Sequence, residues 1–540
     1  MVMFPSNQSN VGKPPDDDPS SKLLEVNASN ITKTEITTNL ETDHQKPIPS
    51  DDVGNLDSFF VDLASPPFQR LVKGTHDFQS NNYQKGSPLV SVGKHMDFAS
   101  ILLKANAEKS FVKGPDETNQ NLSNNARIRL AGQLFIETFS SKYDEISELS
   151  HPSYSGLSDD EAKDIKLLVT LLASAEKTGQ RQFDRATKLI ESCNTTSSPE
   201  GNLIERLVYY FSAAIREKIN REMGRSAHDG LENMQMFDLK EALMSVDTSI
   251  LSLHQKLPMS RICHFSAIHT MIENVKEARK IHIIDLEIRT GMQYSVMLQD
   301  LASRCKKQLE HVKITAIGRR AESNLKDTGK RLADFAQLLN IPFIFKIVMV
   351  ADMLDFNVDL LELEDDEKVA VYAPIFLSTL IVKPKHLEYL MHVIRKINPC
   401  ITIIAEIEAN HTSPVFADRF IEALFFFGAF MDSMAYCLAN DDRGRRVAES
   451  VFIGQSIRNI VAVEGNERTI RHIGVDVWRL FFARFGMVEI ELSAKSLVEA
   501  NLLIDNFDCE SCSIRVHGGC LLVDWKDVPM FSVSAWKFVI

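Results

Sequence analysis

The sequence is short of positive charge. Its 540 residues include 60 Lys and Arg against 73 Asp and Glu, which gives a net charge of −13. A protein that clamps nucleic acid by itself needs a surplus or a dense stripe of cations, because it must neutralise phosphates. We therefore expect any contact with DNA to be weak, through a local patch, or indirect, through a partner.

Long apolar runs and a secretory leader are also missing. The densest apolar run, Ala423–Phe430, is far shorter than the roughly 20 residues of a membrane-spanning helix. The opening segment, MVMFPSNQSN, has no basic region followed by an apolar stretch. The eight cysteines lie mostly inside apolar runs, as at Cys263, Cys400 and Cys437, which is typical of reduced core thiols. We expect a soluble intracellular protein with no membrane partner.

The first part of the chain differs from the rest in composition. Residues 1–156 are rich in Asn, Ser, Asp, Pro and Lys and cannot bury enough apolar surface to offset chain entropy. This segment is predicted to be a disordered, variable N-terminal region. Three apolar islands interrupt it, Leu56–Leu63, Phe98–Leu103 and Ile128–Ile136, and each is either a short helix that orders on a partner or a chance cluster.

Helical patterns begin at residue 157. Ser158 followed by Glu161 has the spacing of a capping box, and the leucines beyond them fall on one helical face. A second helix is predicted from about Asn202 to Glu222. The first helix contains an LxxLL motif that either docks in a partner's groove or is plain core; its leucines are Leu168, Leu171 and Leu172.

Strands alternate with helices from residue 280 onward, which predicts an α/β protein with a largely parallel sheet covered on both faces. Two late strands without long crossovers favour an antiparallel edge. Seven strands with this ending suggest a Rossmann-like sheet of the methyltransferase type. The predicted strands are Ile281–Asp285, Lys313–Ile317, Phe343–Val348, Val369–Tyr372, Ile401–Glu406, Met487–Leu492 and Cys520–Trp525. Helices are predicted at Gln293–Arg304, Gly329–Leu339 and Lys385–Ile397.

The first strand delivers Asp285 to the sheet edge where such folds bind ligands. A nucleotide or methyl-donor site there normally needs several glycines, and this turn has only Gly291. The second strand ends in Gly318-Arg319-Arg320, where a ribose-binding carboxylate is expected. We therefore expect no catalytic residues, no cofactor and no enzymatic activity. A methyltransferase that uses S-adenosylmethionine, or another small-ligand-binding Rossmann-like protein, is the alternative.

Two smaller clusters each have a functional and a structural interpretation. An arginine-rich segment could contact phosphate or a partner, or form a solvated face paired with neighbouring acids such as Asp442 and Glu449; its arginines are Arg443, Arg445, Arg446 and Arg458. Cys509, Cys512, His517 and Cys520 approach the spacing of a zinc knuckle. Because they lie between two predicted strands with a short last gap, we expect no metal.

Several motifs together resemble the plant GRAS family of transcriptional regulators. The family's VHIID signature is matched by Ile281, His282, Ile283, Ile284 and Asp285, followed by Gly291 and Gln293. The stretches SPVFADRFIEALFFFGAFMDSM and NIVAVEGNERTIRH resemble parts of its PFYRE region. The C-terminal SAW region is matched by Trp478, Gly486, Trp525, Ser534, Ala535 and Trp536.

This resemblance divides the chain into regions and also shows departures. It implies a GRAS domain over 157–540, made of a first leucine-rich region with a helical cap (157–222), a VHIID region (241–306), a second leucine-rich region (322–354), a PFYRE region (363–457) and a SAW region (460–540). Tyr294 replaces the usual Trp, and Gln455-Ser456 stands where the family has an Arg-Glu pair. No DELLA-type or VHYNP-type element is present, so the chain looks scarecrow-like rather than a typical DELLA protein.

The resemblance implies a nuclear regulator of transcription that works as a protein-interaction scaffold. Its partners would be other transcription factors or GRAS proteins, the latter as homo- or heterodimers. We expect pairing through the apolar stripes around Leu168–Leu172 and Leu207–Ile215, and a fold-stabilising role for Trp478 and Trp536.

Overall fold

The computed structural model describes residues 122–140, 157–225, 256–304, 309–319, 322–507 and 510–539. The apolar islands Leu56–Leu63 and Phe98–Leu103 lie outside the described residues, as do the start of the expected VHIID region, Arg320 and Cys509.

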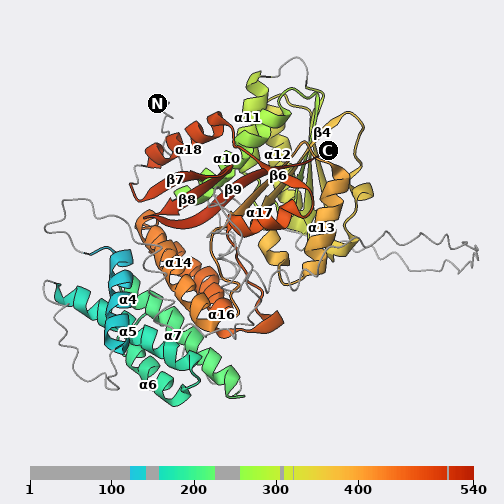
Figure 1. Ribbon diagram of the computed structural model, residues 1–540. Coiled ribbons are helices and arrows are strands. Elements are labelled where there is room, and N and C mark those ends of the chain that lie inside the picture. Colours follow the sequence, from blue (N-terminus) through green and yellow to red (C-terminus); the bar gives the residue numbers. More distant parts are fainter. Residues whose placement is uncertain are drawn as a thin grey trace, which may run out of the picture. The chain divides into compact units, whose positions relative to one another are not determined.

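A single nine-stranded sheet forms the centre of the described chain (Figure 1). Its strand order is β3-β2-β1-β4-β5-β9-β8-β7, and β6 pairs with β9 beside β8. The strands are β1 Lys280–Asp285, β2 His311–Gly318, β3 Phe343–Met349, β4 Glu367–Pro374, β5 Ile401–Ile407, β6 Met487–Ile490, β7 Cys512–His517, β8 Cys520–Trp525 and β9 Val528–Phe538.

The five strands predicted from apolar, β-branched runs are parallel to one another. Alternate residues along β1 and β4 enter separate hydrophobic clusters, so helices cover both faces of the sheet. Ile281 and Ile283 belong to one cluster, and Ile284 belongs to the other. This confirms the Rossmann-like α/β class.

The antiparallel end has more strands than predicted. β9 is antiparallel to β5, β6 and β8, which confirms the expected antiparallel edge. The predicted count of seven strands is wrong, because β7 and β9 were missed. β7 leaves Arg515 and Val516 exposed at the sheet edge, and β9 contains Pro529, Ser532 and Ser534, so neither reads as a continuous apolar run.

Helices pack on the two faces of this sheet. One face carries α10 Pro258–Val275, α11 Gln293–Arg304, α12 Glu322–Leu338 and α18 Ala494–Phe507. The other carries α13 Pro384–Ile397, α17 Val475–Ala483 and the short 3-10 turns η3 Met353–Asp355, η4 Val358–Leu361 and η5 Leu377–Leu380.

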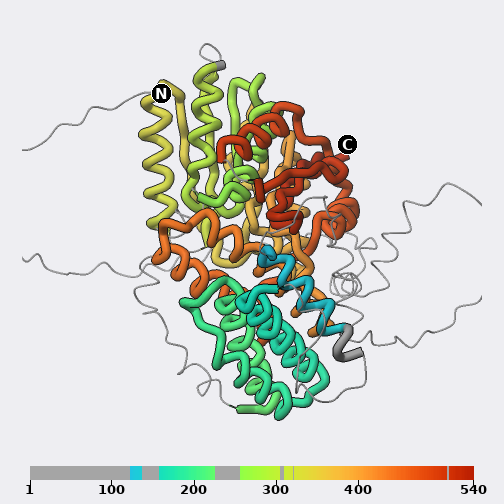
Figure 2. The backbone as a smooth tube through the Cα atoms, turned by 90° about the vertical axis from the view of Figure 1, so that its left-hand side faces the viewer, coloured from blue at the N-terminus to red at the C-terminus, as the bar shows by residue number. Residues whose placement is uncertain are grey.

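A helical cap draws on two distant parts of the sequence (Figure 2). Helices from the N-terminal side pack against helices inserted between β5 and β6. The first group is α4 Asn124–Ser140, α5 Asp159–Gly179, α6 Phe183–Asn194 and α7 Leu203–Glu222. The second is α14 Phe416–Cys437, α15 Asp442–Ala448, the π-helical turn η6 Glu449–Gly454 and α16 Gln455–Ala462, after which the 3-10 turn η7 Gly465–Glu467 follows.

Helix α4 corrects the N-terminal prediction. It lies within the segment expected to be disordered, and it contains the island Ile128–Ile136. Ile128, Leu134 and Phe135 are buried in the same core as the other cap helices. An added Cβ at Gly428 would lie 2.5 Å from Ile128 Cδ1, so α4 packs closely on α14. The island is therefore a helix that orders on this chain's own cap.

The predicted starts of two cap helices are confirmed. Ser158 and Glu161 form the predicted capping box of α5, and Asn202 with Glu205 forms another at the start of α7. Among the described residues, α14 alone is long and apolar enough to cross a membrane, and 72% of its apolar window is buried in the protein. A core helix of a soluble protein passes the same test.

Candidate functional site

The VHIID strand β1 lies in the middle of the parallel sheet, between β2 and β4. Ile281, Ile283 and Ile284 are buried core residues. His282 is also buried, with Nδ1 2.8 Å from Glu367 Oε2 and Nε2 2.8 Å from Thr315 Oγ1. Burial lowers the pKa of His282 to about 4, so the ring is neutral at physiological pH and joins three strands. His282 of the VHIID strand therefore links β1 to both of its neighbours, β2 and β4.

Asp285 at the tip of β1 is held by its own chain. One carboxylate oxygen accepts from the Glu287 N–H at 2.9 Å, and the other accepts from the Tyr294 hydroxyl at 2.7 Å. Complete burial raises the pKa of Asp285 to about 7. The Trp-to-Tyr departure from the family pattern thus places a hydroxyl at the carboxylate, where it fixes the turn that follows β1.

The single glycine of this turn serves packing. Gly291 has a φ of +65°, a conformation that favours glycine. An added Cβ would lie 2.9 Å from Thr328 Cγ2 and 3.1 Å from Leu332 Cδ1 on α12. Its missing side chain therefore admits helix α12 and does not make room for a phosphate.

A polar cavity of about 460 Å³ lies at the carboxyl ends of β1, β2 and β3, where this fold class binds ligands. Four of the charged or titratable groups that line it pair with each other. Arg319 donates to Glu287 at 3.0 Å and lies over the Phe376 ring, and His386 lies 2.9 Å from Asp352. Asp352 also caps η3 by accepting from the Leu354 N–H. Each lining carboxylate already has a cationic partner, so a ribose hydroxyl would have to share it, which disfavours a methyl-donor cofactor here.

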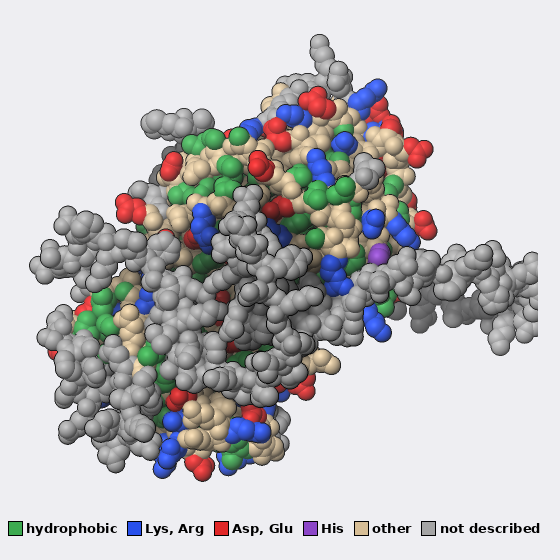
Figure 3. All heavy atoms as spheres, in the orientation of Figure 1, with side chains coloured by type: hydrophobic (Ala, Val, Ile, Leu, Met, Phe, Trp, Pro, Cys, Tyr) green, Lys and Arg blue, Asp and Glu red, His purple; other side chains and the backbone are tan. Residues whose placement is uncertain are grey.

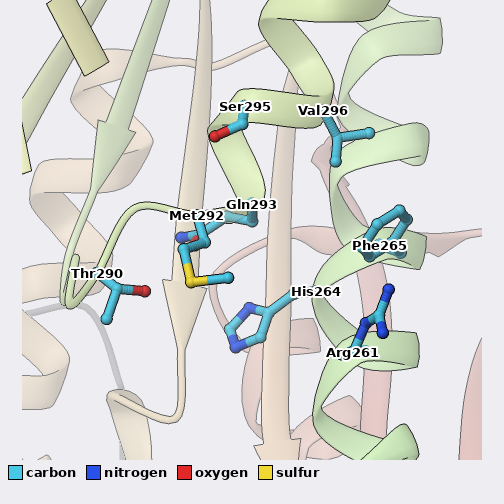
Figure 4. Close-up of a pocket in the computed structure, with 8 residues that line it drawn as sticks. All are labelled: Arg261, His264, Phe265, Thr290, Met292, Gln293, Ser295 and Val296. Atoms are coloured by element: carbon cyan, nitrogen blue, oxygen red, sulfur yellow. The ribbon is translucent and has the colours of Figure 1, made fainter. Parts of the chain in front are cut away.

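A second cavity, of about 380 Å³, lies between α10 and the start of α11 (Figure 4). His264 projects from α10 toward Met292, and Arg261 and Phe265 of the same helix also line the cavity. The His264 Nδ1 is 2.8 Å from the Tyr372 hydroxyl. Met292 is exposed at the opening, so this cavity is a shallow surface feature beside the VHIID turn.

The LxxLL leucines are core residues. Leu168, Leu171 and Leu172 are each at most 1% exposed and lie in the cap's hydrophobic cluster. Leu207 and Ile215 of the second apolar stripe are buried in the same cluster. The expectation that these stripes pair with a second GRAS protein is therefore wrong for the folded chain, because they already pack on α4, α6 and α14.

The contacts of the arginine-rich segment support the structural interpretation, in which its arginines pair with neighbouring acids on a solvated face. Arg445 donates to Glu449 at 2.9 Å, and Arg446 pairs with Asp442 and Glu200, each at 2.7 Å. Farther along the chain, Arg458 donates to Glu217 of α7 at 2.7 Å, and Arg443 is exposed on α15. Basic and acidic side chains are also intermixed over the visible surface (Figure 3). A phosphate would have to displace these carboxylates.

The ion pairs missed from the sequence join the two parts of the cap. Glu449 on η6 is fully buried and accepts from Arg206 of α7 at 3.0 Å as well as from Arg445. Glu464, beyond α16, accepts from Lys218 of α7 and Arg419 of α14. Arg206–Glu449 and Lys218–Glu464 are separated by more than 240 positions, so spacing along the chain could not reveal these two pairs.

The SAW tryptophans are buried, as expected for a role in stability. Trp478 stacks on Phe482, and Trp536 lies with its ring centroid 4.8 Å from that of the same Phe482. The indole N–H of Trp536 donates to Ser534 at 2.9 Å, and that of Trp525 donates to Asp432 of α14 at 2.8 Å. Gly486 has a φ of +74° before β6, and Ala535 is buried in β9.

Possible metal ligands occur in two places. Cys512 and Cys520 are buried at opposite ends of the β7–β8 hairpin. The hairpin therefore keeps apart two of the residues that have zinc-knuckle spacing in the sequence. Elsewhere, donor atoms of His311, Glu364 and Glu367 lie within 4.8 Å of one another. Lys313 is 2.7 Å from Glu367, and Lys280 is 2.7 Å from Glu364, so ammonium groups already supply the positive charge there.

Comparisons with known proteins agree with the motifs. Residues 167–537 match the GRAS domain family model. The DELLA protein GAI1 of Vitis vinifera is 27% identical over 388 residues, which cover 71% of this chain and 63% of the relative. The DELLA protein RGL1 of Arabidopsis thaliana is 27% identical over 393 residues, covering 72% and 73%. This chain thus spans less than two thirds of GAI1.

Among solved structures, that of SCL7 from Oryza sativa superimposes with a TM-score of 0.61 at 25% identity. The match covers 69% of this chain and 99% of that one. The sheet, the cap and the motifs on them thus belong to one known architecture, and the chain is a member of the GRAS family.

Proposed function

We propose that the chain is a plant transcriptional regulator that acts in the nucleus as a platform for other proteins. It would associate with DNA-binding factors or other GRAS proteins and would contact DNA weakly or indirectly. The proposal draws on family membership and on the geometry of the sheet edge. The observation that carries it is the use of Gly291 and Asp285 for internal packing and bonding at the position where an enzyme of this fold holds its cofactor.

The platform would be rigid because the cap is tied to the core. Helices α14 and α16 contact α7, and α14 also contacts β8 and β9. Trp525 of β8 donates to Asp432 of α14 in the same region. Because buried side chains fix the cap to the sheet, the surface of the cap loses little conformational entropy when a partner binds. A small entropy loss favours association.

A recruitment assay tests the proposed regulation. The full chain, fused to a DNA-binding module, is expected to change reporter output in plant nuclei and to accumulate there without the fusion. Asp285→Asn should leave reporter output unchanged, since that carboxylate serves the fold. A clean cytosolic location with no reporter response would refute the proposal.

The methyltransferase alternative has its own test. Calorimetric titration of the full chain with S-adenosylmethionine is expected to give no heat of binding at millimolar ligand. Micromolar binding that Asp285→Ala abolishes would instead establish a cofactor site at the tip of β1.

A further inference from the structure

A third cavity, of about 390 Å³, lies where the cap meets the sheet. Its walls come from α14, from η6 and α16, from the segment after α16, and from the ends of β4 and β5. Most of the wall is apolar and aromatic, with Phe426, Phe427, Phe430, Phe452 and Ile453 among the lining residues. Both its volume and its apolar character are typical of small-molecule sites.

The charged residues that line this cavity are all cationic. Arg289 comes from the turn after β1, and Arg471 comes from the segment between η7 and α17. Arg471 donates to the backbone carbonyls of Arg468 and Gly465. Within the described ranges, neither Arg289 nor Arg471 forms an ion pair with a carboxylate. Arg289 is exposed and Arg471 is half-buried, and guanidinium groups without a carboxylate partner favour binding of an anion.

The surroundings of Arg471 add to this positive charge. Arg468 is 3% exposed and donates to the carbonyls of His411 and Thr412. Arg419 is fully buried and shares Glu464 with Lys218. Lys218 also pairs with Glu222 at 2.9 Å, so Glu464 is the carboxylate that these cations share. Burial, together with repulsion from Arg419, lowers the pKa of Arg471, which an incoming anion would reverse.

The cavity wall also contains an unusual backbone element. Phe452 and Ile453 belong to η6, a π-helical turn of Glu449–Gly454 inside the run from α15 to α16. Such turns are rare and frequently lie at functional sites. His472 contributes a neutral ring, because burial lowers its pKa to about 4, and its Nδ1 lies 2.9 Å from His411 Nδ1.

We propose that this cavity binds a small hydrophobic carboxylic acid, with its apolar body against the α14 phenylalanines and its carboxylate on Arg471 and Arg289. One ligand would then contact the cap and the turn after β1 at once. The proposed site adjoins the sheet-edge cavity at β1, β2 and β3, since Thr379 lines both, but its cations and its aromatic wall are its own. It does not rest on the proposed role in transcription.

Fluorescence titration of the full chain with 1-anilinonaphthalene-8-sulfonate, an aromatic anion, tests the site. Saturable binding at one probe per chain is expected, and dodecanoate should displace the probe whereas its methyl ester should not. Arg471→Gln should weaken binding about tenfold or more, and Arg471→Lys should restore most of it. Ser456→Phe, which fills the cavity, should abolish it.

Two control variants, each of which also replaces one arginine by glutamine, test whether the loss of binding is specific to this cavity. Arg261→Gln removes the cation from the cavity between α10 and α11, and Arg446→Gln removes one from the surface of α15. Both should bind the probe as the parent does, and thermal unfolding should show a cooperative transition for every variant, so that a loss of binding is not a loss of folding. Equal binding by Arg471→Gln and the parent, or equal displacement by the acid and its ester, would overturn the proposal.

Discussion

At the scale of single residues, Asp285 shows how a ligand-binding position can become structural. The carboxylate occupies the place from which this fold class contacts cofactors, yet its two oxygens are bonded to Tyr294 and the Glu287 N–H. Because the side chain is completely buried, its ionised form lacks solvation, and this raises its pKa to about 7. Stability should therefore depend on the protonation of this residue.

The sign of that dependence follows from linkage. The folded chain holds the Asp285 proton up to about pH 7, whereas the unfolded chain releases it near pH 4. Between these values the folded state binds more protons, so the contribution of Asp285 to stability falls as pH rises. Asparagine cannot ionise, and it offers one donor and one acceptor as the protonated acid does. Asp285→Asn should therefore make stability less dependent on pH over this range.

Urea unfolding at pH 5 and pH 8 measures the effect. The difference in unfolding free energy between Asp285→Asn and the parent should move in favour of the variant at pH 8. The buried acids Glu406 and Glu408, whose pKa values burial also raises to about 7, are present in both proteins and cancel in this difference. A difference that is the same at both pH values would contradict the prediction.

Asp285→Ala separates bonding from charge. It leaves the buried Tyr294 hydroxyl without its acceptor, so we expect Asp285→Ala to be about 1–3 kcal/mol less stable than Asp285→Asn at either pH. Tyr294→Phe removes the hydroxyl itself and serves as the matched variant. If Asp285→Ala is as stable as Asp285→Asn at pH 5, the bond to Tyr294 has no structural role.

At the scale of elements, strand β9 and helix α17 form the centre of the SAW region. Trp536→Ala should destabilise the fold by about 3–5 kcal/mol, because it empties space against Phe482 and removes the bond to Ser534. Chemical denaturation measures the loss, and Val539→Ala at the exposed end of the chain is the control. A stable Trp536→Ala protein that had lost only its partners would show that this tryptophan is a contact residue.

The buried acid on η6 gives a second prediction for an element. Glu449→Gln leaves Arg206 and Arg445 without their shared carboxylate, and breaking such a buried pair costs about 3–5 kcal/mol. Arg446→Gln, on the exposed face of the preceding helix, should cost about 0–1 kcal/mol. Comparable urea midpoints for the two variants would mean that the buried pairs do not hold η6 against α7.

What could be predicted from sequence depends on how local the signal is. β8 matches its predicted bounds because the run Cys520–Trp525 is apolar apart from Asp524. The start of α5 was predictable because Ser158 and Glu161 have the spacing of a capping box. β9 interleaves the buried serines Ser532 and Ser534 with apolar residues, so its burial does not appear in the sequence as an apolar run. The spacing of the arginines likewise carried no information about partners such as Glu217 and Glu200.

At the scale of the whole molecule, the cap depends on a segment that composition assigns to the variable N-terminal region. Helix α4 buries Ile128 and Phe135, and Arg127 pairs with Asp164 of α5 at 2.5 Å. The Leu122 N–H donates to Glu161, and Asn124 donates to Asp432 of α14 at 2.6 Å. The folding unit should therefore begin near residue 122 rather than at residue 157.

Two truncations compare these boundaries. A chain of residues 122–540 should unfold at about the same urea concentration as the full protein. A chain of residues 157–540 should be less stable by several kcal/mol, since each large apolar side chain that α4 buries contributes about 1.5–3 kcal/mol. A synthetic peptide of residues 122–140 should restore part of the loss, and the same peptide with Phe135→Ser should not. Equal stability of the two truncated chains would place α4 outside the folding unit and return the boundary to residue 157.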